Sequence, residues 1–505
     1  MKTLTLLSTL LLILNLSNVV YSQNSSDIRR TYHWYFGNGA GLDFSSGTPV
    51  PITNSSMTTI EGCASISDTC GNLLFYTDGD TVWDRNNNVM SNGTGLMGGC
   101  NSSTQSSLII PQPGNDSLYY IFLTDCSENL GANGLSYSIV NMNLNTGLGE
   151  VIEKNTLLYT PAMEKLAATY HANKTDIWIS SVNRYPPGPP PDTSYQYITY
   201  LLTASGINIT PVISPSIVRA PKTEDSYLRF SHNGDKVANA WHGHNDSLSY
   251  YSYGFIELMD FNNATGVLSN SWIFVPDTVV SYGLVFSPDD SKLYYSSYYI
   301  ALPDEMYNNI YQYDLSSNDS ATIATSKVLI QQADISTPLL PMYLGLQTGS
   351  SGEIYIAKWN NEGSTANPDS LAMIQYPNAA GLSCNFIENG VANGGGSEAG
   401  LPNFVDSYFR GTWQEPCNVG IEENDLNKSK FNIYPNPSNG IFYINCNRCT
   451  EVIIYNALGQ RITQHSILKE NSPYRFDISS SPNGMYYITI ETSSNLYSQK
   501  LIINH

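Results

Sequence analysis

The sequence predicts an all-β protein, namely a roughly seven-bladed β-propeller followed by a small antiparallel β-sandwich. A strand, a tight turn and a second strand recur along the chain, most clearly as FSPDDSKLYYSS at residues 286–297. Pro288 presets the backbone angle for a type I turn, and the flanking runs are rich in Tyr, Val, Leu and Phe, which favour strands. Helical spacing of apolar residues is hard to find, so a helical solenoid is a poor alternative.

The recurring unit is about 45–60 residues long, which is the range of a four-stranded propeller blade. About six copies lie between residues 63 and 381. A seventh blade is expected to be composite, built from residues 30–47 and 400–409, because joining the chain ends closes the ring and removes open sheet edges. Strands such as YYIFL and EIYIAKW are apolar at nearly every position, which indicates burial on both faces. Two packed sandwiches are the alternative, but they would leave the shared turn pattern unexplained.

Changes in composition divide the chain into a signal peptide, a propeller, a linker and a C-terminal sandwich, at residues 1–22, 30–410, 411–430 and 431–505. Lys2, the apolar run at residues 4–16 and the short side chains before Gln23 are typical of a secretory signal peptide, cut between Ser22 and Gln23. The run is too short to span a bilayer comfortably, and no later stretch reads as a transmembrane helix. We therefore expect an exported protein without a membrane span.

Charge and cysteine content narrow the class further. The formal net charge of −20 over 505 residues disfavours nucleic acid and anionic membranes as partners. Eight cysteines in an exported chain favour disulfides, and the pairing stays open. Cys63 with Cys70 and Cys446 with Cys449 are possible local pairs, and the second pair lacks the further ligands that a structural zinc site needs.

The C-terminal segment carries, in order, YPNPSNG, VIIYNALGQ, NGMYYITI and a last lysine before an apolar end. This series resembles the type A C-terminal sorting domain of type IX secretion substrates from Bacteroidetes-type bacteria. The resemblance implies recognition by an outer-membrane translocon, passage to the cell surface or medium, and removal of the tail by a sortase-like peptidase. An accessory binding sandwich is the alternative, and the Cys446–Cys449 insert departs from the pattern. The positions that carry the resemblance are Tyr434, Pro435, Asn436, Pro437, Gly440, Tyr455, Gly459, Gln460, Gly484, Tyr486 and Lys500.

The phrases WYFGNGAGLDF, EGCASISDTCGNLLFYTDGDTVWDRNNNVM, SSTQSSLIIPQPGN and GLPNFVDSYF resemble a recurrent group of propeller-bearing proteins from such bacteria. That resemblance implies the fold but no chemistry. Asp-Ser/Thr-apolar triplets also resemble the O-glycosylation acceptor pattern of exported Bacteroidetes proteins, although a turn aspartate before a strand gives the same letters. The candidate acceptors are Thr81, Ser117, Ser247, Thr278, Ser320 and Ser370.

Metal and cofactor signals are weak. On a strand, His242, His244 and Asp246 would project to one side, and imidazole with carboxylate suits several divalent metals. Loop residues of this kind need no ligand, so the set is a candidate only. The aspartates at residues 78–84 resemble a calcium loop loosely but lack a closing glutamate at EF-hand spacing. We predict no cofactor, with calcium as the one open possibility.

Catalytic signals are also sparse. Gly-x-Ser-x-Gly is absent, and no Ser, His and Asp set stands out. Carboxylate pairs for glycosidic hydrolysis could come from distant blades, and Glu61, Glu164, Asp225 and Glu398 fall near predicted blade mouths. Nothing singles these acids out in an acidic protein. The sequence therefore favours a binding or adhesion module for a glycan or protein ligand, with an extracellular polysaccharide hydrolase or lyase as the alternative.

Overall fold

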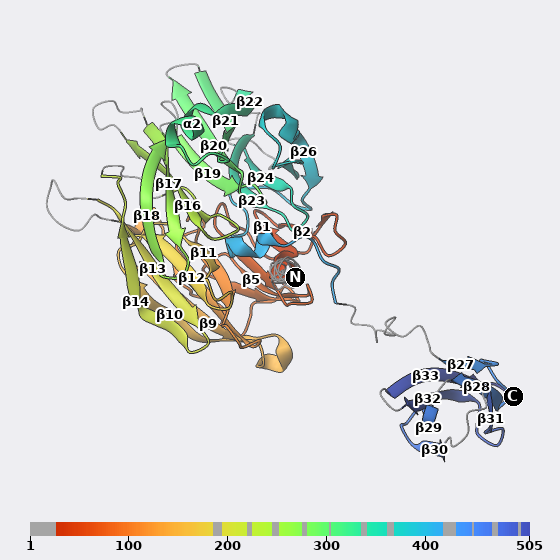
Figure 1. Cartoon of the computed structure of the whole chain (residues 1–505). Coiled ribbons are helices and arrows are strands. Elements are labelled where there is room, and N and C mark those ends of the chain that lie inside the picture. The colour runs from red at the N-terminus through yellow and green to blue at the C-terminus, as the bar shows by residue number, and fades with distance from the viewer. Residues whose placement is uncertain are drawn as a thin grey trace, which may run out of the picture. The chain divides into compact units, whose positions relative to one another are not determined.

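The computed structural model describes residues 27–184, 194–219, 225–244, 252–274, 280–301, 305–334, 341–360, 368–417, 431–446, 449–466, 473–492 and 496–505. The chain divides into two compact units, Met1–Cys417 and Asn418–His505. In both units the regular secondary structure is almost entirely β-strand, as Figure 1 shows. The predicted all-β class is confirmed.

The described part of the first unit forms seven sheets, two with three strands and five with four. Neighbouring strands within each sheet are antiparallel. The three-stranded sheets are β1 (His33–Phe36), β2 (Ala40–Asp43) and β3 (Val50–Pro51), then β4 (Ala64–Ser67), β5 (Leu73–Thr77) and β6 (Val82–Asp84). The first four-stranded sheets are β7 (Ser107–Pro111), β8 (Leu118–Thr124), β9 (Leu135–Asn141) and β10 (Glu150–Tyr159), then β11 (Ala167–Tyr170), β12 (Ile177–Val182), β13 (Gln196–Thr203) and β14 (Gly206–Pro215).

Three further four-stranded sheets follow in chain order. They are β15 (Leu228–Phe230), β16 (Lys236–His244), β17 (Ser252–Asn262) and β18 (Val267–Phe274), then β19 (Val280–Phe286), β20 (Lys292–Ala301), β21 (Glu305–Asp314) and β22 (Val328–Asp334), then β23 (Met342–Thr348), β24 (Ile354–Trp359), β25 (Ser370–Ile374) and β26 (Phe386–Ala392). Short helices complete the unit at η1 (Asp27–Thr31), η2 (Ser127–Asn129), η3 (Asn145–Gly147), α2 (Ser320–Thr325), η4 (Gly381–Cys384) and η5 (Asp406–Arg410).

The repeated turn has a shared hydrogen-bond pattern. The hydroxyl of Ser287 accepts from the backbone N–H of Lys292 at 2.9 Å, and Ser231 accepts from Lys236 at the same distance. Both turns join the first strand of a sheet to the second, so the same side-chain chemistry sets the same hairpin. The turn pattern seen in the sequence therefore reflects a real structural repeat.

Burial on both faces holds for the inner strands. All residues of the inner strands β4, β7, β19 and β23, and of the second strand β12, are buried, without the alternation of a half-exposed sheet. Apolar clusters lie between successive sheets, and buried tyrosines such as Tyr294, Tyr295 and Tyr313 fill much of that space. This arrangement is the one expected of blades stacked around an axis.

The composite blade is wrong in detail. The sheet of β1, β2 and β3 takes no strand from residues 400–409, which end in the helix η5. This segment instead packs among the inner strands: Asn403 donates to the carbonyl of Leu166 at 2.8 Å and accepts from the Arg229 guanidinium at 2.8 Å. The first and last parts of the propeller are still in contact, since the rings of Trp34 and Phe404 lie 6.0 Å apart. Polar side chains in the segment explain the difference, because they satisfy backbone groups near the axis rather than extending a sheet.

Disulfides join Cys70 to Cys417 and Cys100 to Cys126. The possible Cys63–Cys70 pair is wrong, and Cys63 is a free, buried thiol. Strand β4 separates the two residues, and its four residues span roughly 13 Å, beyond the roughly 7 Å that bonded Cα atoms reach. Cys449 is in a disulfide, whereas the side chain of Cys446 lies outside the described residues.

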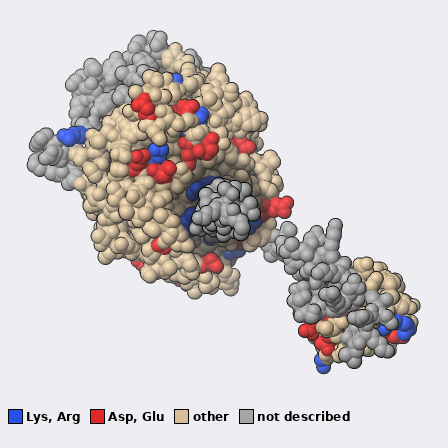
Figure 2. All heavy atoms as spheres, in the orientation of Figure 1, with Lys and Arg blue, Asp and Glu red and all other residues tan. Residues whose placement is uncertain are grey.

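Residues 411–417, expected to belong to the linker, pack on the propeller. The indole N–H of Trp413 donates to the carbonyl of Phe44 at 3.0 Å, and the backbone N–H of Gln414 donates to the hydroxyl of Tyr32 at 3.0 Å. The rest of the predicted linker, residues 418–430, lies outside the described residues. Most of the visible surface is uncharged, as Figure 2 shows, in line with only 13% charged residues.

The second unit is a two-sheet sandwich around a core that includes Phe442, Val452, Ile488 and Leu501. One sheet contains β27 (Phe431–Tyr434), β28 (Ile441–Cys446) and β31 (Tyr474–Asp477). The other contains β30 (Arg461–Ser466), β29 (Cys449–Asn456), β32 (Gly484–Thr492) and β33 (Leu496–Ile503).

Candidate functional site

Loops from separate sheets place polar side chains at one end of the ring. Glu61, Thr104, Glu164 and Asp225 each precede the first residue of an inner strand by three positions, before β4, β7, β11 and β15. Inner strands of a propeller run in the same direction, so the residues before them gather at the mouth of the ring. We call the following set the mouth cluster: Glu61, Thr104, Glu164, Lys165, Asp225, His242, Tyr282 and Tyr298.

Thr104 joins two of the acids. Its hydroxyl lies 3.1 Å from Oε2 of Glu61 and 3.0 Å from Oε2 of Glu164. Glu164 also accepts from the backbone N–H groups of Thr104 at 2.8 Å and Ser127 at 2.5 Å. A hydroxyl donates one proton only, so it cannot stabilise both carboxylates in their ionised forms. The geometry favours a proton on one of the two glutamates.

Asp225 and Lys165 belong to the second part of the mouth cluster. Nε2 of His242 lies 3.3 Å from Oδ1 of Asp225. The ammonium of Lys165 is fully buried and donates to the hydroxyl of Ser226 at 2.6 Å and to the carbonyls of Ser226 and Ala240 at 3.0 and 2.8 Å. It also lies 5.4 Å from the ring centre of Trp241. Neutral acceptors, rather than a carboxylate, therefore hold this cation.

The groups of the cluster have divergent pKa values. Burial, together with the carboxylates of Glu164 and Asp225, raises the pKa of Glu61 well above its ordinary value. Burial raises the pKa of Glu164 to about 7 and lowers the pKa of Lys165 to about 7. Burial also opposes ionisation of Asp225, but His242 outweighs it and the pKa of Asp225 falls below its ordinary value. The surroundings therefore favour the ionised form of Asp225 and the protonated form of Glu61.

The cluster has a buried floor and an accessible side. Glu164 is 1% exposed and Lys165 is fully buried, whereas the side chain of Asp225 is 42% exposed and Glu61 is half-buried. The protein around Asp225 still shields it from bulk water, which is why burial acts on its pKa. A ligand that approaches the mouth would therefore meet Asp225 and Glu61 first.

The structure brings Glu61, Glu164 and Asp225 together. Glu398 lies on the segment that returns to the axis, and the next residue, Ala399, donates its N–H to the carbonyl of Ile60 at 2.8 Å. Sequence reasoning missed Thr104, Lys165, Tyr282 and Tyr298. The available signal was the fixed spacing of three residues before each inner strand, which requires known strand starts.

The structure describes the two predicted metal sites to different extents. His242 faces Asp225, while the side chain of His244 and all of Asp246 lie outside the described residues, so that set stays a prediction. In the loose calcium loop, Asp78 accepts from the N–H groups of Asp80 and Thr81 at 2.9 and 2.8 Å, and so caps a turn. Among the described residues, one potential metal-ligand group is Cys100, Cys126 and Glu128, but its two cysteines share a disulfide and offer no thiolate.

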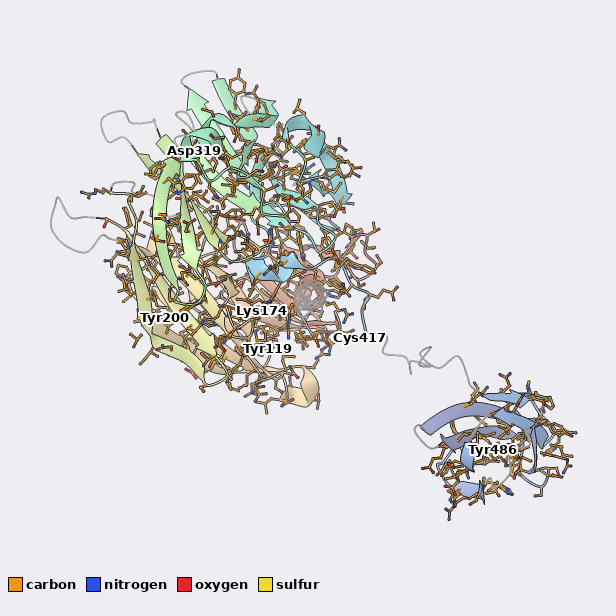
Figure 3. The ribbon with its side chains drawn as sticks, in the orientation of Figure 1. Tyr119, Lys174, Tyr200, Asp319, Cys417 and Tyr486 are labelled. Atoms are coloured by element: carbon orange, nitrogen blue, oxygen red, sulfur yellow. A yellow bond between two sulfur atoms is a disulfide. The ribbon has the colours of Figure 1, made fainter. Side chains whose placement is uncertain are left out.

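The glycosylation candidates stay predictions. Ser247 and Thr278 lie outside the described residues. Ser320 begins the helix α2, capped by Asp319 (Figure 3), where a strand was expected. The hydroxyl of Ser370 lies 3.0 Å from the ammonium of Lys358, whereas Thr81 and Ser117 are half-buried in turns.

A concavity at the other end of the inner strands lies beside η1 and η5. There the hydroxyl of Tyr170 donates to Asp27 at 2.9 Å, and Ser407 accepts the backbone N–H of Tyr170 at 3.0 Å. These polar groups hydrogen-bond the first and last parts of the propeller to β11, so we assign them a structural role.

The sorting-motif residues build the C-terminal sandwich. Asn436 donates to the carbonyl of Lys500 at 2.7 Å and accepts from the N–H of Ile502 at 2.9 Å, which ties the YPNP segment to β33. Gly440 has φ +96°, and a Cβ there would lie 2.4 Å from Cα of Ser479. Pro435 and Pro437 follow cis peptide bonds.

The remaining motif positions lie in turns and on the sheet of β29 and β32. Gly459 has φ +74° in the turn that ends at Gln460, whose N–H donates to Asn456 at 2.9 Å. Tyr455 and Lys500 both pair in register with Tyr487, while Tyr486 (Figure 3) donates to the carbonyl of Pro482 at 2.7 Å and Gly484 begins β32. The predicted cleavage site at Ser22 and Gln23 lies outside the described residues.

Comparison with known proteins identifies the tail. Residues 432–504 match the family described as "Secretion system C-terminal sorting domain". Solved structures similar to the chain include a quinonprotein alcohol dehydrogenase-like protein from Bacteroides thetaiotaomicron (14% identity, TM-score 0.37, 74% of this chain and 77% of that chain). A TolB-like protein from Agrobacterium tumefaciens has 13% identity and TM-score 0.30 over 59% of this chain and 86% of its own. At these TM-scores the similarities say nothing about activity.

No curated protein matches the chain. The sorting domain establishes that the protein is a type IX secretion substrate, secreted or exposed at the cell surface. Within the described residues, we find no helix with the length and apolar character needed to cross a membrane.

Proposed function

We propose that the chain is a non-catalytic binding protein of the cell exterior, in which the mouth cluster holds part of a glycan or protein ligand. One observation carries this proposal: acids from separate sheets converge at one end of the ring, with Asp225 42% exposed beside His242. A convergent set of polar groups with shifted pKa values is the usual mark of a site rather than of a solvated surface.

The position of the C-terminal connection is consistent with a propeller that presents its mouth to a ligand. Glu61 precedes β4 and Cys70 follows it, so the Cys70–Cys417 disulfide lies at the opposite end of this strand from the mouth. The chain leaves the propeller after Cys417, labelled in Figure 3. A propeller attached through this end presents its mouth away from the attachment point.

The export partners follow from the C-terminal domain. We expect the outer-membrane translocon to recognise it and a sortase-like peptidase to remove it, so that residues after about Asn432 are missing from surface material. Peptide mapping of the surface fraction measures this, and full-length protein retained there would contradict it.

An extracellular polysaccharide hydrolase or lyase is the second candidate. It draws on the contrast between Glu164, with a pKa of about 7, and ionised Asp225, since acid–base catalysis needs neighbouring groups with separated pKa values. Release of reducing or unsaturated ends from any polysaccharide would favour this reading over the binding protein.

The binding proposal is tested with glycan and peptide arrays probed by the mature full-length protein. Glu61→Gln and Asp225→Asn should each weaken array binding at least about tenfold, because each removes a charge or acceptor at the accessible side. Glu153→Gln, on the exposed face of β10, is the matched control. Binding that is unchanged in both mouth variants would refute the site.

A further inference from the structure

The mouth cluster has polar atoms without partners as well as acids. The hydroxyl of Tyr282 is buried, at 4% exposure, and makes no well-aligned hydrogen bond among the described residues, although it lies within reach of the carboxyl group of Glu61. Its electrostatic coupling to both Glu61 and Asp225 places it against the cluster. Ser281 is five residues before Phe286, as Asp225 is before Phe230, and its buried hydroxyl also lacks a partner in the described part of the chain. Buried polar groups without partners are costly, so these hydroxyls are suited to hydrogen-bond a ligand that enters the mouth.

Among the described residues of the mouth, carboxyl groups outnumber basic groups. Three carboxyl groups, Glu61, Glu164 and Asp225, interact unfavourably with one another. Lys165 lies on the buried side and is held by neutral acceptors, and Nε2 of His242 lies 3.3 Å from Oδ1 of Asp225. Tyr227 and Tyr298 add hydroxyl groups near Glu61 and no positive charge. The accessible side is therefore rich in acceptors and suits a positively charged donor.

The spacing of the acceptors favours an organic cation over a metal ion. Among the described residues, no three groups from the mouth acids and His242 place their ligand atoms within 4.8 Å of one another, as a divalent-metal site built on these side chains would require. An ammonium or guanidinium group carries several N–H donors and can bond to separated oxygens, each bond being charge-assisted. The negative charge of the whole chain also steers cations toward it.

We propose that the mouth cluster binds the ammonium or guanidinium group of a lysine or arginine side chain on a partner protein. This inference rests on the proposed function and specifies its ligand class. The cation hydrogen-bonds to Asp225 and to Glu61, and Glu61 gives up its proton to solvent as the cation enters. The balance is one neutral carboxylic acid and one cation going to one ion pair and one released proton.

The test is calorimetric titration of the mature full-length protein with a short peptide of alternating lysine and glycine, at pH 7 and physiological ionic strength. The enthalpies measured in phosphate and in Tris differ by the number of protons released, because the two buffers have different ionisation enthalpies. We expect release of roughly one proton per bound peptide, and loss of binding when the lysines are acetylated. Glu61→Gln should lower proton release and weaken binding at least about tenfold, while Glu153→Gln on β10 should change neither.

The outcomes separate this inference from the proposed function. Equal binding of the acetylated peptide, binding without proton release, or no peptide binding would each overturn the inference. If neutral glycans on the array then still lose binding in Asp225→Asn, the mouth is a binding site and only the ligand class is wrong. If array binding is unchanged in both Glu61→Gln and Asp225→Asn, the proposed function is wrong as well as the inference. Asp225→Asn also provides a second variant if Glu61→Gln does not fold.

Discussion

The Cys70–Cys417 disulfide should contribute more stability than any local crosslink, because it closes almost the whole propeller. The two cysteines are 347 residues apart, whereas Cys100 and Cys126 are 26 apart. In the chain-entropy treatment, closing these loops restricts the unfolded chain by about 6 kcal/mol for the first bond and about 3.5 kcal/mol for the second at 25 °C. The predicted difference is therefore about 2 kcal/mol in the free energy of unfolding.

The variants keep the native contacts nearly intact. Arg29 donates to Sγ of Cys417 at 3.5 Å and to the carbonyl of Thr69 at 3.3 Å, and a serine at position 417 can still accept that bond. Residues 411–417 also keep the hydrogen bonds of Trp413 and Gln414. The change therefore acts mainly on the unfolded chain, as the entropic argument requires.

The assay is guanidinium-induced unfolding of the full mature chain, followed by tryptophan fluorescence. All seven tryptophans lie in the first unit, so the signal reports the propeller without the sorting domain. The pair Cys70→Ser with Cys417→Ser should lower the unfolding free energy more than Cys100→Ser with Cys126→Ser. An equal or larger loss in the second pair would refute the reasoning, and so would a loss below about 1 kcal/mol in the first.

Three further predictions concern the mouth and the tail. Lys165→Met should remove a pH dependence of stability between pH 7 and 10.5. In the folded protein the buried lysine has a pKa of about 7, so the unfolded chain binds more protons in this window. The unfolding free energy of the wild type therefore rises there by up to about 1.4 kcal/mol per pH unit. Denaturation at pH 7 and pH 9 measures the slope, which the surface control Lys154→Met should retain. Gly440→Ala should destabilise the sorting domain by roughly 1–3 kcal/mol through positive φ and contact with Ser479, reducing export as measured by immunoblot of the medium, with an unchanged tryptophan-detected midpoint. Gly459→Ala, which has positive φ but open space, should reduce export less; an equal effect would contradict the steric argument.

Local features of the fold were predictable from the sequence, and long-range features were not. The Ser287–Lys292 turn and the fully buried strands depend on residues that are close in sequence, so the local sequence pattern predicted them. The axial segment depends on Asn403 meeting Leu166 across 237 positions and Asp406 meeting Phe230 across 176. No local pattern encodes such a pairing. The expectation of a strand in residues 400–409 failed because a polar segment can also be ordered by inner-strand backbone groups.

The mouth cluster shows the same limit in chemical terms. An acid three residues before a strand looks the same in sequence as any turn acid, and an acidic protein has many of them. What distinguishes Glu61 and Glu164 is the single hydroxyl of Thr104 between them, and that residue comes from a third loop. The ring turns one repeated position into one shared environment, in which each acid changes the protonation of the next. Because repetition supplies the convergence, a substitution at any one of these loops should alter the charge state of the others, even where their own sequences are unchanged.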